Sequence, residues 1–371
     1  MNFSYWEKTT WFKHIDFTIV GSGITGLNCA LQLRKNHPKA KILILERDLL
    51  PNGASTKNAG FACFGSASEL LDDLKTNTKE EMLALVNRRV EGLQILRETI
   101  GDKALKFKTH GGYELFTEEN KTLFKSCESQ LKTLNELLFP IFKEEVFSVV
   151  DNNFGFKKIQ QQLIFNKSEG QLDTGKMMQA LMHKAHHANI QILNGVEVLK
   201  YEENQNSVKV ITNNFELETQ KLCIATNGFA KKLNINEVKP ARAQVLITKP
   251  IKNLHIQGTF HLEEGYYYFR NIDNRILLGG GRNLDFKTEE TMQMTLTALI
   301  QRKLEELLKE VILPQTSFEI DQRWSGIMGV GNQKKPILEK LSPKVFCGVR
   351  LGGMGVAIGS LVGKELANLS S

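Results

Sequence analysis

The chain has 371 residues, of which 41% are hydrophobic and 24% are charged, and this composition excludes an intrinsically disordered protein. Its formal net charge of +7 suits anionic ligands, but lysine and arginine are mixed with acids along the chain, which disfavours a nucleic-acid partner. The first residues do not resemble a secretory signal and no run of about 18 apolar residues follows, so we expect a cytoplasmic protein without a transmembrane segment.

The first predicted unit is a strand, a tight turn and a helix within DFTIVGSGITGL, residues 16–27. Three glycines lie between a β-branched run and a segment with apolar residues at helical spacing. Gly21 would make the turn, Gly23 would let backbone approach a pyrophosphate, and Gly26 would let the helix pack closely on the strand. The free N–H groups of the helix N-terminus would then face the phosphates.

A second strand, KILILE, ends in Glu46, twenty residues after Gly26. A carboxylate at this distance is typical of one that accepts hydrogen bonds from an adenosine ribose. Because no basic residue replaces it, the position favours FAD or NAD over NADP. The alternative is an ordinary βαβ unit with a surface glutamate.

The segment after the second strand, PNGASTKNAGFACFGSASEL, is rich in small and polar residues. Here the sequence resembles the superfamily of FAD enzymes that includes D-amino acid oxidase, glycine oxidase and sarcosine oxidase. In that superfamily a GAS-x-x-N-x-G-like stretch passes the pyrophosphate and the flavin, and the matching residues are Gly53, Ala54, Ser55, Asn58 and Gly60. The resemblance implies FAD as the cofactor.

Three further segments extend the resemblance, in family order. LDTGKMMQALMHKA with the following VEVLKYEE looks like the helix and strand that return to the FAD domain. KLCIATNGFA resembles the strand and turn that close the nucleotide site. GVRLGGMGVAIGSLVGKEL looks like the glycine-rich turn and helix at the flavin's pyrimidine end. The physical chemistry agrees, since a helix N-terminus stabilises negative charge near a reduced flavin. The alternative is a small-residue packing helix.

The glycine turns and the resemblance together predict a noncovalent FAD site. Some sarcosine-oxidising relatives attach FAD to a cysteine, but Gly326 aligns with that position. The predicted cofactor-binding residues are Gly21, Ser22, Gly23, Ile24, Thr25, Gly26, Glu46, Arg47, Ala54, Ser55, Thr56, Asn58, Ala59, Gly60, Phe61, Val196, Thr226, Asn227, Gly228, Gly352, Gly353, Met354, Gly355 and Val356.

The predicted fold class is α/β, with an inserted second domain. Residues 77–100 and 119–142 show helical apolar spacing, while LKFKTHGGYELF and YYYFRNIDNRILLGG read as strands. We expect a Rossmann-like FAD-binding domain of the glutathione-reductase type and an α+β substrate domain built on a mixed or antiparallel sheet. The FAD-binding domain would comprise residues 1–75, 165–240 and 320–371, and the substrate domain residues 76–164 and 241–319.

Three residues are candidates for substrate binding and catalysis. Tyr268 and Arg270 alternate on one strand and so share a face, where a hydroxyl and a guanidinium fork would hold a carboxylate. The alternative for Arg270 is a sheet residue paired with a surface acid. Arg350 stands where relatives usually have glycine, and it would either bind a substrate carboxylate or cap a helix. Met328 aligns with the arginine that clamps small amino acids in relatives, which disfavours a simple glycine oxidase.

No metal site is predicted. The five cysteines form no CxxC pair and have no histidine cluster nearby. His183, His186 and His187 lie on a segment rich in lysine and alanine without an acid or cysteine partner, so a solvated helix face is expected.

The resemblance implies an FAD-dependent oxidoreductase that takes a hydride from an amino acid or amine, a small-molecule substrate, and gives an imine that water hydrolyses. Positioning of the substrate would be the main task of the protein. Oxygen or a quinone would accept the electrons, and Leu277 replaces a lysine that assists oxygen activation in relatives. The alternatives are a 2-hydroxy acid or polyol dehydrogenase of the same superfamily and a flavoprotein associated with transfer RNA.

Overall fold

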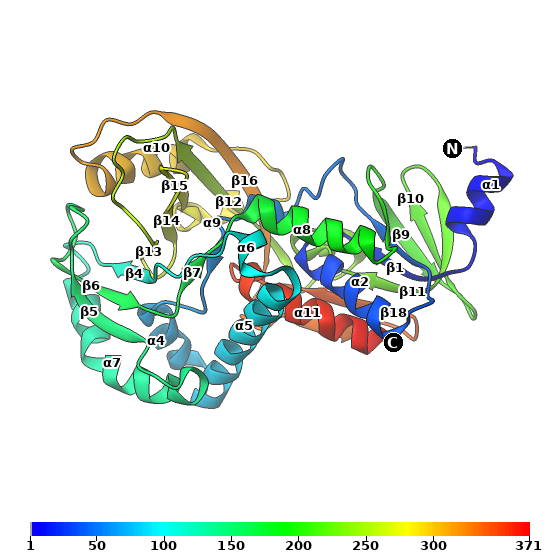
Figure 1. The fold of residues 1–371 in the computed structure, drawn as a ribbon, viewed down its shortest axis with the longest axis horizontal. Coiled ribbons are helices and arrows are strands. Elements are labelled where there is room, and N and C mark those ends of the chain that lie inside the picture. The colour runs from blue at the N-terminus through cyan, green and yellow to red at the C-terminus, as the bar shows by residue number, and fades with distance from the viewer. Residues whose placement is uncertain (1) are drawn as a thin grey trace.

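The computed structural model describes residues 2–371, which form two lobes, each built on its own sheet. Figure 1 shows the first lobe on the right with the chain termini, and the second lobe on the left. In the part of the chain that is described, both main sheets have eight strands. A short two-stranded ladder of β3 (Phe61–Ala62) and β7 (Gly170–Gln171) forms the third sheet. None of the helices within residues 2–371 is long and apolar enough to span a membrane.

The first sheet has a parallel centre of the kind that binds nucleotides. β1 pairs in parallel with β2 and β11, and β11 pairs in parallel with β18. The strands are fully or largely buried and rich in Ile, Leu and Val, as expected when helices cover a parallel sheet. Its strands are β1 (Ile15–Val20), β2 (Ile42–Leu45), β8 (Gln191–Leu193), β9 (Val198–Glu203), β10 (Val208–Thr212), β11 (Glu216–Ile224), β17 (Ile337–Lys340) and β18 (Val345–Val349).

Three helices pack on this sheet: α2 (Ile24–Asn36), α8 (Thr174–His187) and α11 (Gly355–Ser370). Helices α2 and α11 lie side by side (Figure 1), and their backbones come so close that a Cβ on Gly363 would lie 2.5 Å from the Thr25 carbonyl oxygen. The first turn of α2 therefore packs against the middle of α11.

The second sheet is mixed and mainly antiparallel, with β13 and β4 as its parallel pair. Its strands, in spatial order, are β16 (Ile320–Val330), β12 (Lys239–Thr248), β15 (Arg275–Gly280), β14 (Tyr267–Ile272), β13 (Thr259–Leu262), β4 (Gly112–Leu115), β6 (Gln162–Asn166) and β5 (Phe147–Asp151). One face carries buried aromatic residues, including Phe260 and Phe269, whose rings stack at 4.5 Å, and α10 (Ala298–Leu307) packs there.

Helices α4 (Ala67–Thr76), α5 (Lys79–Ile100) and α7 (Lys121–Phe142) lie at the β4, β6 and β5 end of the second sheet (Figure 1). Helix α5 also packs against α11, where Arg88 makes a two-point ion pair with Glu365 at 2.6–2.7 Å. The remaining elements are short: α1 (Tyr5–Glu7), η1 (Lys8–Phe12), α3 (Ala54–Lys57), α6 (Asp102–Leu105), η2 (Asn227–Leu233), η3 (Arg282–Leu284), α9 (Phe286–Glu289) and η4 (Leu308–Ile312).

The predicted fold class is confirmed, and α5 and α7 occupy the two segments expected to be helical. Two details differ from the sequence analysis. The expected strand LKFKTHGGYELF narrows to β4, because α6 ends at Leu105 within that stretch. Strand β16 belongs to the second sheet, although residues from 320 onward were expected in the nucleotide domain. Strand β16 joins the second sheet because it pairs with β12 in a long antiparallel ladder, from Lys239 opposite Val330 to Thr248 opposite Ile320.

Candidate functional site

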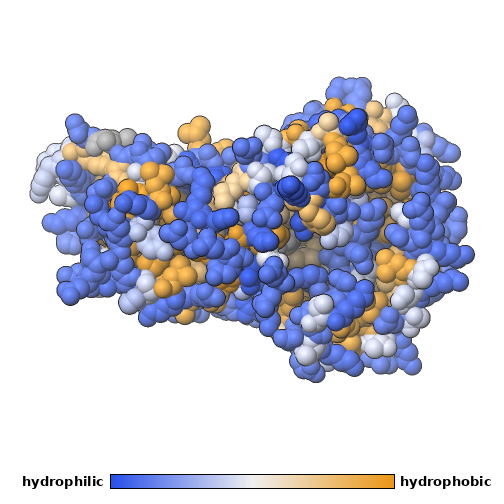
Figure 2. Space-filling model, turned by 180° about the vertical axis from the view of Figure 1, so that it is seen from behind, coloured by the Kyte–Doolittle hydropathy of each residue, from blue (hydrophilic) through white to orange (hydrophobic). Residues whose placement is uncertain are grey.

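A cavity of about 550 Å³ is lined by residues of both lobes. Its walls combine the loops that follow β1, β2 and β11, the turn before α11, and side chains of the second sheet. Figure 2 shows that the surface is hollowed between the two lobes on the face opposite to that of Figure 1. The cavity therefore lies where nucleotides bind in open α/β sheets, beyond the carboxyl ends of the parallel strands.

The turn between β1 and α2 has the geometry that its glycines predict. Gly21 has a φ of +102°, which disfavours residues with a side chain. A Cβ on Gly26 would lie 1.9 Å from the Gly21 carbonyl oxygen, so only glycine allows this close packing. Gly23 caps α2 without a side chain, and the Ile24 N–H donates to Ser55 Oγ at 3.0 Å. Gly23, Ile24 and Thr25 line the cavity, so the start of α2 faces it.

The turn before α11 provides a second helix N-terminus without a side-chain cap. Gly352 has a φ of +59°, and a Cβ on Gly352 or Gly353 would meet no atom within 4 Å. Both glycines line the cavity, so this empty space faces a ligand. Asn227 fixes the turn, because its Oδ1 accepts from the Leu351 N–H at 3.1 Å.

Glu46 lies in the nucleotide end of the cavity with 6% of its surface exposed. Its Oε2 accepts from the Ser22 N–H at 3.1 Å and from Ser22 Oγ at 2.6 Å, and its Oε1 accepts from the Asp48 N–H at 3.3 Å. These bonds fix the carboxylate and leave acceptor capacity, because its two oxygens offer about four lone-pair sites.

Two buried hydroxyls support a ligand of the predicted chemistry. Thr25 and Thr226 line the cavity, and their Oγ1 atoms have no hydrogen-bond partner among the described residues. Buried polar groups are normally paired. Donors on both sides of the glycine turns, together with open helix N-termini, fit the phosphates of a dinucleotide.

Most of the residues predicted to bind FAD come together in this cavity. Twenty of the 24 line it, and the other four do not. Those four are Ser22, Gly26, Thr56 and Gly228. The sequence analysis did not name Phe229, whose ring lies 3.7 Å from the guanidinium carbon of Arg47, or the lining residues Lys57 and Lys232.

The three predicted substrate residues lie in different surroundings. Tyr268 lines the cavity and packs against the Phe61 ring at 5.7 Å, and burial raises the pKa of its hydroxyl to about 12. Arg350 also lines the cavity, with a φ of +63° and its Nε donating to the Lys335 carbonyl at 2.9 Å.

Arg270 is 2% exposed and is not among the residues that line the cavity. It lies behind the Gly60 backbone, with Nη2 3.2 Å from the place of a Gly60 Cβ. Burial lowers the pKa of its guanidinium to about 10, although Asp173 and Asp273 oppose this shift. Its Nε has no partner among the described residues. Arg270 shares the sheet face with Tyr268, as alternation requires, but the loop carrying Gly60 separates it from the cavity.

A buried histidine that the sequence analysis missed also lines the cavity. His261 Nε2 lies 2.6 Å from Glu169 Oε1, and Thr259 donates to the same oxygen at 2.8 Å. Burial opposes the imidazolium, but the Glu169 carboxylate outweighs it and raises the pKa of His261 to about 9. The residue is therefore charged at neutral pH. The sequence held one sign of this role, because His261 lies opposite the predicted substrate residue Tyr268 in the β13–β14 hairpin.

A second buried carboxylate lies beside His261 on the same sheet. Glu114 accepts from Ser66 Oγ at 3.0 Å, from the Ser68 N–H at 3.1 Å and from Ser68 Oγ. Burial raises its pKa in spite of these bonds. The bonds join the start of α4 to the second sheet. Within residues 2–371, no group of three or more His, Cys, Asp and Glu side chains is placed to hold a metal ion.

Comparisons with known proteins agree with this geometry. Residues 16–369 match the family model described as FAD dependent oxidoreductase, DAO. The chain is 21% identical to the probable oxidoreductase OrdL of Haemophilus influenzae, over 96% of this chain and 83% of that protein. It is 22% identical to the gamma-glutamylputrescine oxidoreductase of Escherichia coli, over 95% of this chain and 83% of that protein.

Two solved structures have the same fold. Glycine oxidase from Geobacillus kaustophilus has a TM-score of 0.77 at 20% identity, with 96% of this chain and 94% of that chain covered. L-proline dehydrogenase from P. horikoshii has a TM-score of 0.74 at 18% identity, with 96% of this chain and 93% of that chain covered.

Proposed function

Because the chain belongs to the DAO family of FAD dependent oxidoreductases, we propose that it oxidises an amino acid or a secondary amine by hydride transfer to flavin N5. The C–H bond next to the amine nitrogen breaks, its hydride goes to FAD, and the resulting imine is hydrolysed by water. Glycine oxidase and L-proline dehydrogenase, whose folds match this one, are named for amino acids. FAD supplies the two-electron acceptor when it is bound.

The residues around the cavity fit a noncovalent FAD. The open start of α2 and the unpaired Thr25 hydroxyl would hold the pyrophosphate, and Glu46 would accept from the adenosine ribose. The start of α11, with Gly352 and Gly353, would face the flavin ring. The five cysteines are free and buried, and burial raises the pKa of the cavity-lining Cys63 thiol well above its usual value, which disfavours a reactive thiolate.

The observation that carries the proposal is the contact of His261 Nε2 with Glu169 Oε1 at 2.6 Å, because His261 is the histidine that lines the cavity within residues 2–371. As an imidazolium bound to Glu169 it has no lone pair with which to take a proton. Oxidation of an alcohol requires removal of the hydroxyl proton as the hydride leaves, whereas an amine that has first lost its ammonium proton to solvent delivers a hydride without a base in the site. The charged histidine therefore favours amines over 2-hydroxy acids.

The test is anaerobic reduction of the purified holoenzyme. Amino acids, secondary amines, 2-hydroxy acids and polyols are added separately, and bleaching of the flavin absorbance is followed. We expect reduction by at least one amine or amino acid and an imine-derived carbonyl product. Reduction by hydroxy acids or polyols alone would contradict the proposal.

A further inference from the structure

Arg282 is the first residue of η3, directly after β15 of the second sheet, and it lines the cavity. The sequence analysis did not name it. Its guanidinium carbon lies 5.0 Å from the centroid of the Phe286 ring and 5.9 Å from that of the Tyr266 ring. The two rings meet edge to face at 5.9 Å, and Tyr266 also lines the cavity. An arginine in contact with aromatic faces has fewer side-chain conformations to lose when it binds a ligand.

The Arg282 side chain makes no hydrogen bond or ion pair with any residue that the structure describes. Among the other cations that line the cavity, Lys334 pairs with Asp73 and Arg350 donates to a backbone carbonyl, while the Lys57 ammonium has no partner among the described residues. Glu263, which is close in sequence to Tyr266, accepts instead from Asn283 Nδ2 at 3.4 Å. Arg282 therefore presents a cation, partly buried and without a protein anion, to the cavity.

The backbone on both sides of Arg282 is fixed. The Gly281 N–H donates to the Tyr266 carbonyl at 3.0 Å. Gly280 has a φ of +123°, and a Cβ there would lie 2.0 Å from the same oxygen. These contacts hold the end of β15 against the β13–β14 turn and place Arg282 beside Tyr266.

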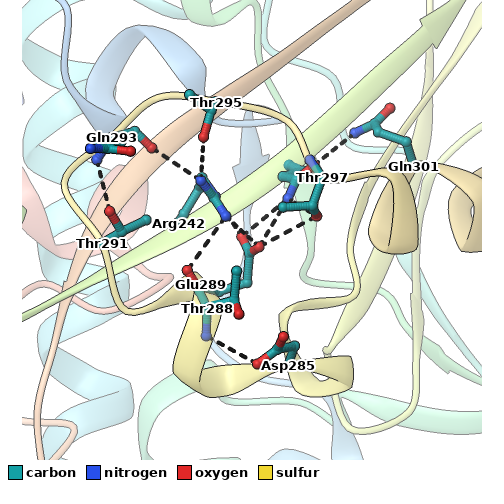
Figure 3. Close-up of polar contacts among 10 residues, drawn as sticks. Arg242, Asp285, Thr288, Glu289, Thr291, Gln293, Thr295, Thr297 and Gln301 are labelled. Atoms are coloured by element: carbon teal, nitrogen blue, oxygen red, sulfur yellow. Dashed lines mark hydrogen bonds and ion pairs between the residues drawn. The ribbon is translucent and has the colours of Figure 1, made fainter.

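The segment after Arg282 is anchored by a buried ion pair on the far side of the sheet (Figure 3). Arg242 Nε and Nη2 donate to the two Glu289 carboxylate oxygens at 2.8 and 2.6 Å, with both side chains at most 4% exposed. Gln244 donates to the same carboxylate at 3.1 Å and to Thr297 Oγ1 at 2.7 Å. This network ties α9, which carries Phe286, to β12. The segment that carries Arg282 and Phe286 is therefore held in place by buried hydrogen bonds.

We propose that Arg282 binds the anionic group of the substrate, and that this group is a carboxylate. The inference rests on the proposed amine oxidation and specifies its substrate class: an amino acid whose carboxylate meets Arg282. Two acids complete the match. Glu264 and Glu69 line the same cavity, and Glu69 Oε1 lies 2.9 Å from the place of a Cβ on Gly265, next to Tyr266. Their carboxylates offer negative charge to the ammonium group of a zwitterionic amino acid as it binds.

The experiment uses the FAD-loaded enzyme and its Arg282→Met and Arg282→Lys variants. Benzoate is the probe, and its dissociation constant is measured from the change in flavin absorbance. In parallel, kcat/KM is measured for the best amino acid substrate and for its amide, which lacks the carboxylate. Arg302→Lys, on the exposed side of α10, is the matched control, because its Nε donates only to its own helix. FAD content is determined for every variant.

We expect Arg282→Met to raise the benzoate dissociation constant about tenfold or more and to remove most of the preference for the acid over the amide. Arg282→Lys should do the same to a smaller extent, because a point charge cannot reproduce the planar fork. FAD content should stay unchanged, and Arg302→Lys should behave as wild type. Unchanged benzoate affinity and unchanged acid preference in FAD-loaded Arg282→Met would overturn the inference, as would a wild type that neither binds benzoate nor prefers the acid.

Failure of the proposed function gives a different result. If no amine or amino acid reduces the wild-type flavin, amine oxidation is wrong. Loss of benzoate binding in Arg282→Met would then still assign the anion site to Arg282. If amines reduce the flavin but Arg282→Met is unaltered, only the assignment of Arg282 is wrong.

Discussion

At the scale of single residues, the ion pair of His261 and Glu169 makes stability depend on pH. The pKa of His261 is raised from 6.5 to about 9 in the folded protein. A group whose pKa is raised by folding stabilises the protein fully below its unfolded pKa, and this contribution is lost as pH rises through the folded pKa. The contribution of the pair should thus be complete below about pH 6.5 and absent above about pH 9.

We therefore predict that Glu169→Gln destabilises the protein by about 1–3 kcal/mol near pH 6, because His261 and Thr259 lose a charged acceptor. The gap between variant and wild type should narrow as pH approaches 10. Urea unfolding at pH 6, 8 and 10 measures this. Glu144→Gln, which removes an exposed partner of Lys167, is the control and should change little. A gap that is constant across this pH range would show that the pair is not the cause.

At the scale of elements, the turn from β1 into α2 depends on the contact between Gly26 and the Gly21 carbonyl. A Cβ on Gly26 would lie 1.9 Å from that oxygen and 3.3 Å from Ile19 Cγ2, so the helix would have to move away from the strand. Both sides of this contact are backbone or buried core, and neither yields easily. The start of α2, where the pyrophosphate is expected, would move with it.

We predict that Gly26→Ala costs about 1–3 kcal/mol of stability and that the purified variant retains less FAD than wild type. Gly175→Ala is the matched control: Gly175 is exposed in α8, and its Cβ would come only within 3.4 Å of Asp173 Oδ1. That change should be neutral or slightly stabilising, since alanine favours the helix. Thermal unfolding measures the loss of stability, and the ratio of flavin to protein absorbance measures the FAD that is retained. A Gly26→Ala variant with wild-type flavin content would contradict the expected role of the turn.

At the scale of the whole molecule, the cavity is lined by both lobes, so FAD would lie between them without a covalent bond. Gly326 stands where some relatives carry an attachment cysteine, and a Cβ there would lie 2.7 Å from Lys57 Cβ. We predict that the purified protein is yellow and that acid precipitation releases the flavin into the supernatant. Colour that remains in the pellet after the precipitate is washed would show a covalent link.

Local sequence patterns sufficed to bring together the residues that are predicted to bind the nucleotide. The glycine turn after β1, Glu46 after β2 and the glycines before α11 lie in short strand-turn-helix units, whose backbone geometry depends on residues close in sequence. The helices α5 and α7 followed from apolar spacing for the same reason. The end of the second domain could not be predicted in this way, because the position of β16 depends on its pairing with β12, which is distant in sequence.

The surroundings of the residues proposed to bind substrate depended on tertiary structure. Strand alternation correctly gave Tyr268 and Arg270 a common face, but it could not show that the loop carrying Gly60 covers Arg270 while Tyr268 stays open to the cavity. The pKa of His261 is raised by Glu169, which lies 92 residues away in the sequence. The position of Arg282 depends on the rings of Tyr266 and Phe286 and on the anchored segment that carries Phe286. A sequence pattern fixes which way a side chain points; what lies across from it is decided only when distant segments pack together.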